Sequence, residues 1–350
     1  MEVPSIFLNR ILSDIAKRGA SCLHLSVGSS PIARINGRLV HIEDTNIITV
    51  ETLKKIIDSF TSKEELEILE KEREIVIVKK FGGNFRFRIN IFYQKDLPSL
   101  SFNYIHDFIR NLDNLKIPEL IKKTINLNSG LLVVAGPNDS GKTSTVAAFI
   151  EELNKNEEKY IITIESPIEY VFINNRSVIE QRQVGRDVLS YVDGLEHCLE
   201  EDVDLVYVDT IKKEFEQAMP YIFELASGNS FVILEVDAAS SVRVIEKILN
   251  AAKVKISEEA ARFNLADILV GIIVQNLIPS RGGGMSLALE TLAVNSAVKS
   301  LIREGKIYQL ESIIQTSREE GMISMKKSIQ DLVKEGKIPQ EEVGKMELEF

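Results

Sequence analysis

The sequence has few of the features that mark secreted, zinc-binding or membrane-spanning proteins. Its 350 residues include two cysteines, Cys22 and Cys198, which lie far apart without CxxC spacing or a neighbouring histidine cluster. This argues against a disulfide framework and against a zinc site, and we expect both thiols to be buried. No window approaches the roughly 18 consecutive apolar residues that a membrane-spanning helix needs.

An excess of basic residues is also missing. Lys and Arg total 42 against 52 Asp and Glu, which gives a net charge of -10. Binding to nucleic acid depends on clustered basic side chains that release counterions from the phosphate backbone, so no nucleic acid is expected as a partner. The first twenty residues do not follow the basic, apolar, small-residue order of a signal peptide, and we expect a cytoplasmic protein.

What is present is the composition of a globular protein, with 44% hydrophobic and 27% charged residues. The length predicts two domains. The first, residues 1–112, mixes helical and strand patterns, and its Asn36-Gly37 and Gly82-Gly83 pairs indicate turns between strands. An α+β domain of antiparallel hairpins follows from this pattern. We expect helices at 6–17, 51–60 and 63–71, and strands at 22–27, 32–35, 74–81 and 84–93.

The pattern changes class after residue 126. Four apolar runs, LLVVAG, YIITI, LVYV and FVILEV, alternate with segments of helical length. Such alternation is typical of an α/β fold in which helices cover a parallel sheet. We therefore place a linker at 113–126, an α/β core at 127–256, and a mostly helical C-terminal part at 257–350.

The strongest motif runs from Gly136 to Thr143 and matches GxxxxGK[ST] in full. A strand precedes it and a helix follows, so backbone N–H groups and the helix N-terminus can hold phosphates. Lys142 is expected to reach the β and γ phosphates, and Thr143 to bind Mg²⁺. Asp139 adds a negative charge there, which leaves open a loop that no longer binds. The predicted nucleotide-binding residues are Gly136, Pro137, Asn138, Asp139, Ser140, Gly141, Lys142, Thr143 and Ser144.

Five stretches of the chain carry a further signal, namely GASCLHLSVGSSPIARINGRL, FRFRIN, GPNDSGKTSTVAAFI, ITIESPIEYV with EQRQVGRDVLSY, and AVKSLIREGKIYQLESIIQTSREEGM. Together they resemble the PilT-like motors of type IV pili and type II secretion. The last of them is similar to an element particular to retraction motors. The resemblance implies a PAS-like α+β N-terminal domain, then a RecA-like P-loop NTPase domain with a helical C-terminal part, and ATP and Mg²⁺ as ligands.

The resemblance also implies an assembly. Six subunits would form a ring with ATP between neighbours, either a homohexamer or a mixed hexamer with an intact paralogue. Its partner would be an inner-membrane pilus platform protein, at the inner face of the cytoplasmic membrane. Arg86, Arg88, Arg182 and Arg186 match family positions whose guanidinium groups reach the phosphates and stabilise charge during transfer. Alternatively, the alternation FRFR merely exposes one side of a hairpin.

The sequence departs from the family at its catalytic carboxylates. Where the family has TIEDPIE, this chain keeps Glu165 but has Ser166 in place of the second acid. Where the family strand ILVGE ends in the catalytic glutamate, this chain has Thr210, which cannot accept a proton from water. Asp209 precedes it, and we predict that Asp209 still serves as a catalytic and metal-binding carboxylate. Adjacent strand residues face opposite sides, but this alternation can relax at a strand end.

Other departures concern histidines and arginines. Both histidines of the family's TGHLVFGTLHT are absent from residues 227–237, and Glu196 and Glu200 stand where the family has arginines. Glu235 and Asp237 then allow two interpretations. Either acid replaces the missing carboxylate, or both are solvated residues left after selection for hydrolysis ended. We favour the second, because one acid would not compensate for two histidines and two arginines.

Three hypotheses for function follow. The first is a ring-forming, ATP-binding component of a pilus retraction motor that hydrolyses ATP slowly or only beside an intact paralogue. The second is a nonhydrolytic scaffold or regulator of an active motor. The third is a full ATPase that uses Asp209 and Glu235. Small GTPases are disfavoured because the chain lacks NKxD, and kinases because it has no recognisable acceptor site.

Overall fold

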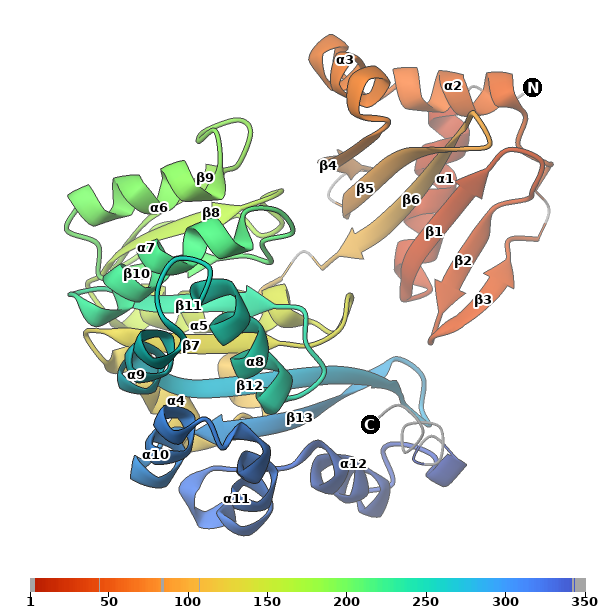
Figure 1. Cartoon of the computed structure of the whole chain (residues 1–350). Helices are drawn as coiled ribbons and strands as arrows, with labels where there is room; N and C mark the ends of the chain where they lie inside the picture. The colour runs from red at the N-terminus through yellow and green to blue at the C-terminus, as the bar shows by residue number, and fades with distance from the viewer. Residues whose placement is uncertain (1–3, 44, 83–84, 107, 342, 344–350) are drawn as a thin grey trace. The chain divides into compact units, whose positions relative to one another are not determined.

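The chain folds into two units, each built on one β-sheet. The first comprises residues 1–108 with 282–285, and the second comprises residues 109–281 with 286–350. The computed structural model describes residues 4–43, 45–82, 85–106, 108–341 and 343 (Figure 1).

Six strands of the first unit form a sheet in the order β3-β2-β1-β6-β5-β4. All of its pairs are antiparallel, which confirms the pairing predicted from the alternation and turn residues. The turn predicted at Gly82-Gly83 extends outside the described residues. The elements are α1 (Pro4–Lys17), β1 (Ala20–Ser26), β2 (Ile32–Ile35), β3 (Arg38–His41), α2 (Val50–Asp58), α3 (Lys63–Glu72), β4 (Glu74–Phe81), β5 (Phe85–Gln94) and β6 (Leu97–Ile105).

The alternation on β5 explains this sheet's core. Phe87 and Ile89 point into the core and are fully buried, whereas Arg86 and Arg88 between them are partly exposed. Successive side chains of a strand point to opposite faces, so the arginines lie on the face away from that core.

The second unit contains the predicted parallel sheet. Its order is β13-β12-β7-β11-β10-β8-β9, and every pair from β12 to β9 is parallel. The strands are β7 (Gly130–Ala135), β8 (Tyr160–Glu165), β9 (Val178–Gln183), β10 (Leu205–Val208), β11 (Phe231–Val236), β12 (Leu269–Pro279) and β13 (Met285–Ala293). Parallel order brings the carboxyl ends of β7, β11, β10 and β8 to one edge.

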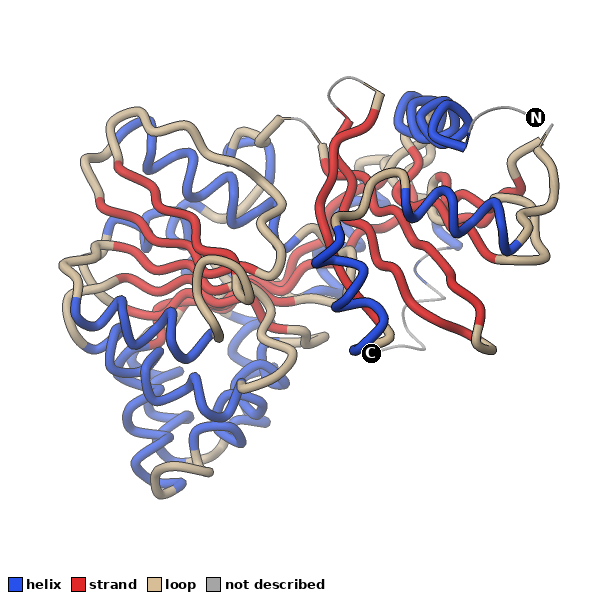
Figure 2. The backbone as a smooth tube through the Cα atoms, turned by 90° about the horizontal axis from the view of Figure 1, so that it is seen from above, coloured by secondary structure: helices blue, strands red, loops and turns tan. Residues whose placement is uncertain are grey.

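Helices cover both faces of this sheet (Figure 2). On β7, Leu131 and Val133 face a core shared with α6 to α10, while Leu132 and Val134 face a core shared with α5. Within the described residues, no helix has the length and apolar character that a bilayer crossing requires. The helices are α4 (Glu119–Lys122), α5 (Lys142–Asn156), α6 (Tyr191–Glu200), α7 (Phe215–Ser227), α8 (Ser241–Ala252), α9 (Glu258–Ile268), α10 (Ser296–Glu304), α11 (Leu310–Thr316) and α12 (Met325–Lys334), with short 3₁₀ turns η1 (Leu112–Leu115), η2 (Lys123–Asn126), η3 (Ile307–Gln309) and η4 (Arg318–Glu320).

Two segments differ from their expected form. The segment 113–126, expected as a linker, folds as η1, α4 and η2, and its Leu115, Ile121 and Ile125 are buried in the core beside α5. The part from residue 257, expected to be mostly helical, includes the long strands β12 and β13. The sequence MSLALETLA of β13 is rich in helix formers, and pairing in the sheet overrides that local preference. β12 begins directly after α9, so no turn residue marks its start.

Phe149 offers a direct test of the layer formed by α5. Its side chain is fully buried against the sheet, so Phe149→Ala should lower the free energy of unfolding by about 3–5 kcal/mol. Lys155→Ala, at an exposed position of the same helix, should change it by less than about 0.5 kcal/mol. Urea denaturation followed by circular dichroism measures both. Equal effects of the two substitutions would contradict the packing of α5.

Candidate functional site

A glycine-dependent loop joins β7 to α5. Gly136 has φ 152° and Gly141 has φ 88°, conformations that side-chain-bearing residues rarely adopt. A Cβ atom on Gly136 would lie 2.4 Å from the carbonyl oxygen of Gln275 and 2.4 Å from Oγ of Ser140. Asp139, also left-handed with φ 61°, is exposed. The chain therefore turns sharply here and enters the helix at Lys142.

The N-terminus of α5 is suited to an anion. Gly141 is its N-cap residue and provides no side-chain cap, so the first-turn N–H groups keep their capacity to bind a ligand. Together with the dipole of this 15-residue helix, they favour phosphate. The hydroxyl of Ser140 is buried and has no hydrogen-bond partner within the described residues. The loop thus fits the phosphates of a nucleotide.

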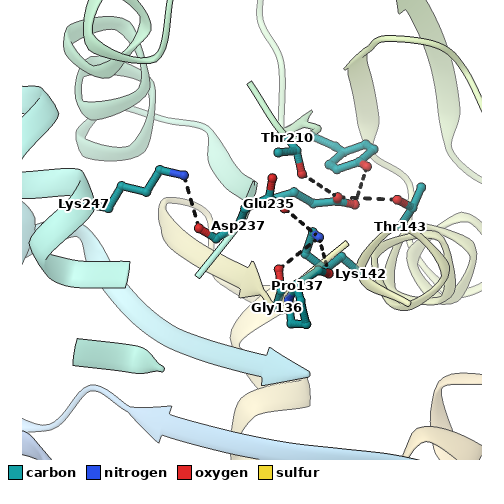
Figure 3. A network of polar contacts seen from close by, with 9 residues as sticks. Gly136, Pro137, Lys142, Thr143, Thr210, Glu235, Asp237 and Lys247 are labelled. Carbon is teal, nitrogen blue, oxygen red and sulfur yellow. Dashed lines mark hydrogen bonds and ion pairs between the residues drawn. The ribbon is translucent and has the colours of Figure 1, made fainter. Parts of the chain in front are cut away.

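Lys142 is held by its own loop and by an acid that directly follows β11. Its Nζ donates to the carbonyl oxygens of Gly136 at 3.2 Å and Pro137 at 3.0 Å. The same Nζ lies 2.9 Å from Oδ1 of Asp237, a charge contact rather than an aligned hydrogen bond. Lys247 donates to the carbonyl oxygen of Asp237 at 3.2 Å (Figure 3). Asp237, 37% exposed, therefore competes with any phosphate for the lysine.

Glu235 is buried among hydroxyl groups, with 3% of its surface exposed. Its Oε1 accepts a hydrogen bond from the Tyr207 hydroxyl at 2.7 Å. Its Oε2 accepts from Thr143 at 3.4 Å and from Thr210 at 3.3 Å (Figure 3). Burial raises the pKa of Glu235 to about 7, opposed by the Tyr207 hydrogen bond and the charge of Lys142. The expectation that Glu235 is a solvated residue is wrong, because the strand carries it into the core.

Glu165 lies at the end of β8 and is also buried, with 2% exposed. Its Oε1 accepts hydrogen bonds from Thr163 Oγ1 at 2.6 Å and from Gln181 Nε2 at 3.1 Å. Burial raises the pKa of Glu165 to about 7, and the negative charges of Glu169 and Glu235 add to this effect. The carboxyl is therefore fixed in place within the sheet edge.

Asp209 follows β10 and is held from the side of β8 and α6. Its Oδ2 accepts from the Ser166 amide at 2.7 Å, and its Oδ1 accepts a short hydrogen bond from the Tyr191 hydroxyl. Burial raises the pKa of Asp209 well above its ordinary value. Thr143, the loop residue predicted to bind Mg²⁺, donates its hydroxyl hydrogen bond to Glu235 within the described residues. This contact does not involve Asp209, so metal binding by Asp209 stays a prediction.

The remaining predicted residues lie in different surroundings. Ser144 Oγ contacts the Tyr170 hydroxyl at 2.9 Å. Arg182 donates to Glu201 at 2.9 and 3.0 Å and to Glu180 at 3.1 Å, so acids of its own unit neutralise it. Arg186 is exposed beyond the end of β9. Arg86 and Arg88 belong to the first unit, while Glu196 and Glu200 are exposed on α6.

Sequence reasoning missed three tyrosines of the site, Tyr170, Tyr191 and Tyr207. Their hydroxyls contact Ser144, Asp209 and Glu235. Tyr207 carried a usable signal: it lies in the apolar run LVYV, and a tyrosine in a buried strand requires a partner for its hydroxyl. That partner could have been sought among acids on the neighbouring strand.

The buried carboxyl of Glu165 predicts a pH dependence of stability. Its folded pKa of about 7 exceeds the unfolded value of 4.5, so its contribution weakens as pH rises from 4.5 to 7. Glu165→Gln abolishes this titration. From pH 5 to pH 8, wild type should therefore lose about 2 kcal/mol of unfolding free energy relative to the variant. Denaturation of both proteins without nucleotide at each pH measures this; a constant difference would contradict a raised pKa.

Comparisons with known proteins show the family of the chain. The family described as type II/IV secretion system protein matches residues 2–282. The type IV pilus retraction ATPase PilT of Pseudomonas aeruginosa is 31% identical over 336 residues, covering 95% of this chain and 96% of that protein. The type IV pilus ATPase PilU of the same organism is 26% identical over 334 residues, covering 95% and 86%.

A solved structure leads to the same family. The crystal structure of the pilus retraction motor PilT with bound ADP matches with a TM-score of 0.79 and 31% identity, covering 96% of this chain and 95% of that chain. The likeness extends over both units. The chain therefore belongs to the type II/IV secretion system protein family, as a PilT-like secretion ATPase.

Proposed function

We propose that this chain is an ATP-binding and slowly hydrolysing subunit of a type IV pilus retraction motor. The loop between β7 and α5 carries the proposal, because Lys142 and Thr143 begin a helix whose N-terminus has no side-chain cap. Such a terminus binds phosphate. The bound ADP in the PilT crystal structure supports an adenine nucleotide.

The residues of the loop would divide the work of binding. Lys142 would leave Asp237 and bind the β and γ phosphates. The first-turn N–H groups of α5 would donate to the nucleotide. Thr143 presents a hard oxygen donor of the kind that Mg²⁺ takes. Mg²⁺, when bound, neutralises charge on the phosphates. Slow turnover is expected because Thr210 stands where the family has its catalytic glutamate.

The assembly is proposed from the same likeness. Copies of this chain would form a homohexamer, or a mixed hexamer with an intact paralogue. The relatives PilT and PilU are two type IV pilus ATPases of one organism. The first unit would act as the PAS-like domain, residues 127–256 as the RecA-like core, and Arg86, Arg88, Arg182 and Arg186 as phosphate contacts. The ring would work at the cytoplasmic side of the membrane, on a pilus platform protein.

A nonhydrolytic scaffold is the second candidate. The ion pair between Lys142 and Asp237 favours it, because this contact opposes binding of the triphosphate, and so does the absence of a carboxylate at Thr210. Steady-state turnover separates the candidates. A turnover rate of order one per second supports a motor. A turnover rate no higher than that of a variant without a working phosphate-binding loop supports the scaffold.

Lys142→Ala tests the nucleotide site. Loss of a charged contact to phosphate should weaken ATP binding by about 10- to 100-fold. The matched control is Lys155→Ala, which removes an exposed lysine from the same helix and should leave affinity unchanged. Titration of a fluorescent ATP analogue measures both. Unchanged affinity in Lys142→Ala would show that the loop does not bind nucleotide.

Asp237→Asn tests the competition for Lys142. Without the opposing carboxylate, Lys142 turns to phosphate at less cost, and ATP affinity should rise about fivefold. The increase should shrink at high salt, because Asp237 is partly exposed and its charge is screened. The same titration at low and high salt measures it. A weaker affinity would mean that Asp237 assists binding instead.

A further inference from the structure

We infer that Glu235 is the carboxylate that activates water for ATP hydrolysis in this chain. The inference rests on the proposed function and goes beyond it, since it assigns the reaction to one residue. Its basis is a single oxygen atom: Oε2 of Glu235 meets the hydroxyl of Thr143 at 3.4 Å and the hydroxyl of Thr210 at 3.3 Å.

The placement of Glu235 follows from strand pairing. β11 lies between β7, which leads into the phosphate-binding loop, and β10, which ends at Val208, two residues before Thr210. Glu235 is opposite Val134 of β7, and Leu234 is opposite Val208 of β10. Its side chain points to the face covered by α5, where Thr143 begins the helix. A carboxylate is thereby held at the edge where the phosphates would lie.

The other two buried acids are engaged elsewhere. Glu165 accepts hydrogen bonds from Thr163 and Gln181, and Asp209 accepts from Ser166 and Tyr191. Within the described part of the chain, Glu235 is the one of these three carboxylates that hydrogen-bonds to a residue of α5. Position, rather than acidity, distinguishes Glu235.

A purely structural role accounts poorly for this residue. The strand FVILEV is buried along its whole length, and an acid inside such a strand carries a desolvation cost that an apolar residue avoids. Three hydroxyl groups, from Tyr207, Thr143 and Thr210, orient the carboxyl. Such fixed polar groups in a buried site are the supporting arrangement that a reacting group needs.

The reaction assigned to Glu235 is general-base assistance. The oxygen of water forms a bond to the γ-phosphorus, and the bond from that phosphorus to the β–γ bridging oxygen breaks, with its electron pair staying on ADP. One proton of the water passes to the Glu235 carboxylate and from there to solvent. The products are ADP and inorganic phosphate, and no further reactant is required.

Exchange of two side chains tests the inference. Glu235→Gln keeps the shape of the residue and one acceptor oxygen but removes the base, so kcat should fall about 100-fold. ATP affinity should stay within about threefold, and ATP rather than ADP should be recovered from the protein after incubation. The double variant Thr210→Glu with Glu235→Gln moves the carboxylate to the segment that follows β10, and its kcat should be at least about tenfold higher than that of Glu235→Gln alone.

Two further variants serve as controls. Glu224→Gln, an exposed position on α7, should leave all measured values unchanged, and Lys142→Ala gives the blank. Wild-type turnover equal to that blank, or Glu235→Gln within twofold of wild type, overturns the inference. Equal losses of kcat and ATP affinity without rescue would assign Glu235 a structural role. In each case, retained ATP binding by wild type leaves the proposed nucleotide site intact.

A second variant guards against failure to fold. Glu235→Asp keeps the charge but withdraws it by one methylene group, so kcat should fall about tenfold or more with ATP affinity kept. An unchanged kcat in Glu235→Asp contradicts a positioned base. Thermal unfolding of each variant without nucleotide separates misfolding from lost chemistry.

Discussion

Parallel pairing of β10, β11 and β7 is the constraint on which the site depends. Because these strands run in one direction, their carboxyl ends meet at one edge, and the loop of Gly136 opens onto the same edge. The contact between Thr143 and Glu235 exists only because β11 lies beside β7. A change in strand order would separate the phosphate-binding loop from the buried acids.

The charged side chains at this edge of the sheet determine how readily the site can bind an anion. Three acids, Glu165, Asp209 and Glu235, have pKa values raised chiefly by burial. Lys142, a buried cation among them, is paired with a fourth acid, Asp237. A triphosphate would bring more negative charge, so Lys142 would have to leave Asp237 before it could bind one. These charges oppose the binding of a triphosphate even though the loop is intact.

Much of the fold could be predicted from the sequence, because the apolar runs and the GxxxxGK[ST] motif each specify strand, loop and helix locally. β13 could not, since its Leu, Ala and Glu residues favour a helix and only long-range pairing makes them a strand. The burial of Glu235 was missed for a related reason. Its partners Tyr207, Thr143 and Thr210 come from other segments, and their distances follow from strand register rather than local pattern.

The most direct test is a structure of the full chain with a nonhydrolysable ATP analogue and Mg²⁺. We predict that Lys142 leaves Asp237 for the β and γ phosphates, and that the carboxylate of Glu235 faces the γ-phosphate through one water molecule. A complex in which Lys142 stays on Asp237, or in which Asp209 or Glu165 occupies that place instead of Glu235, would contradict it.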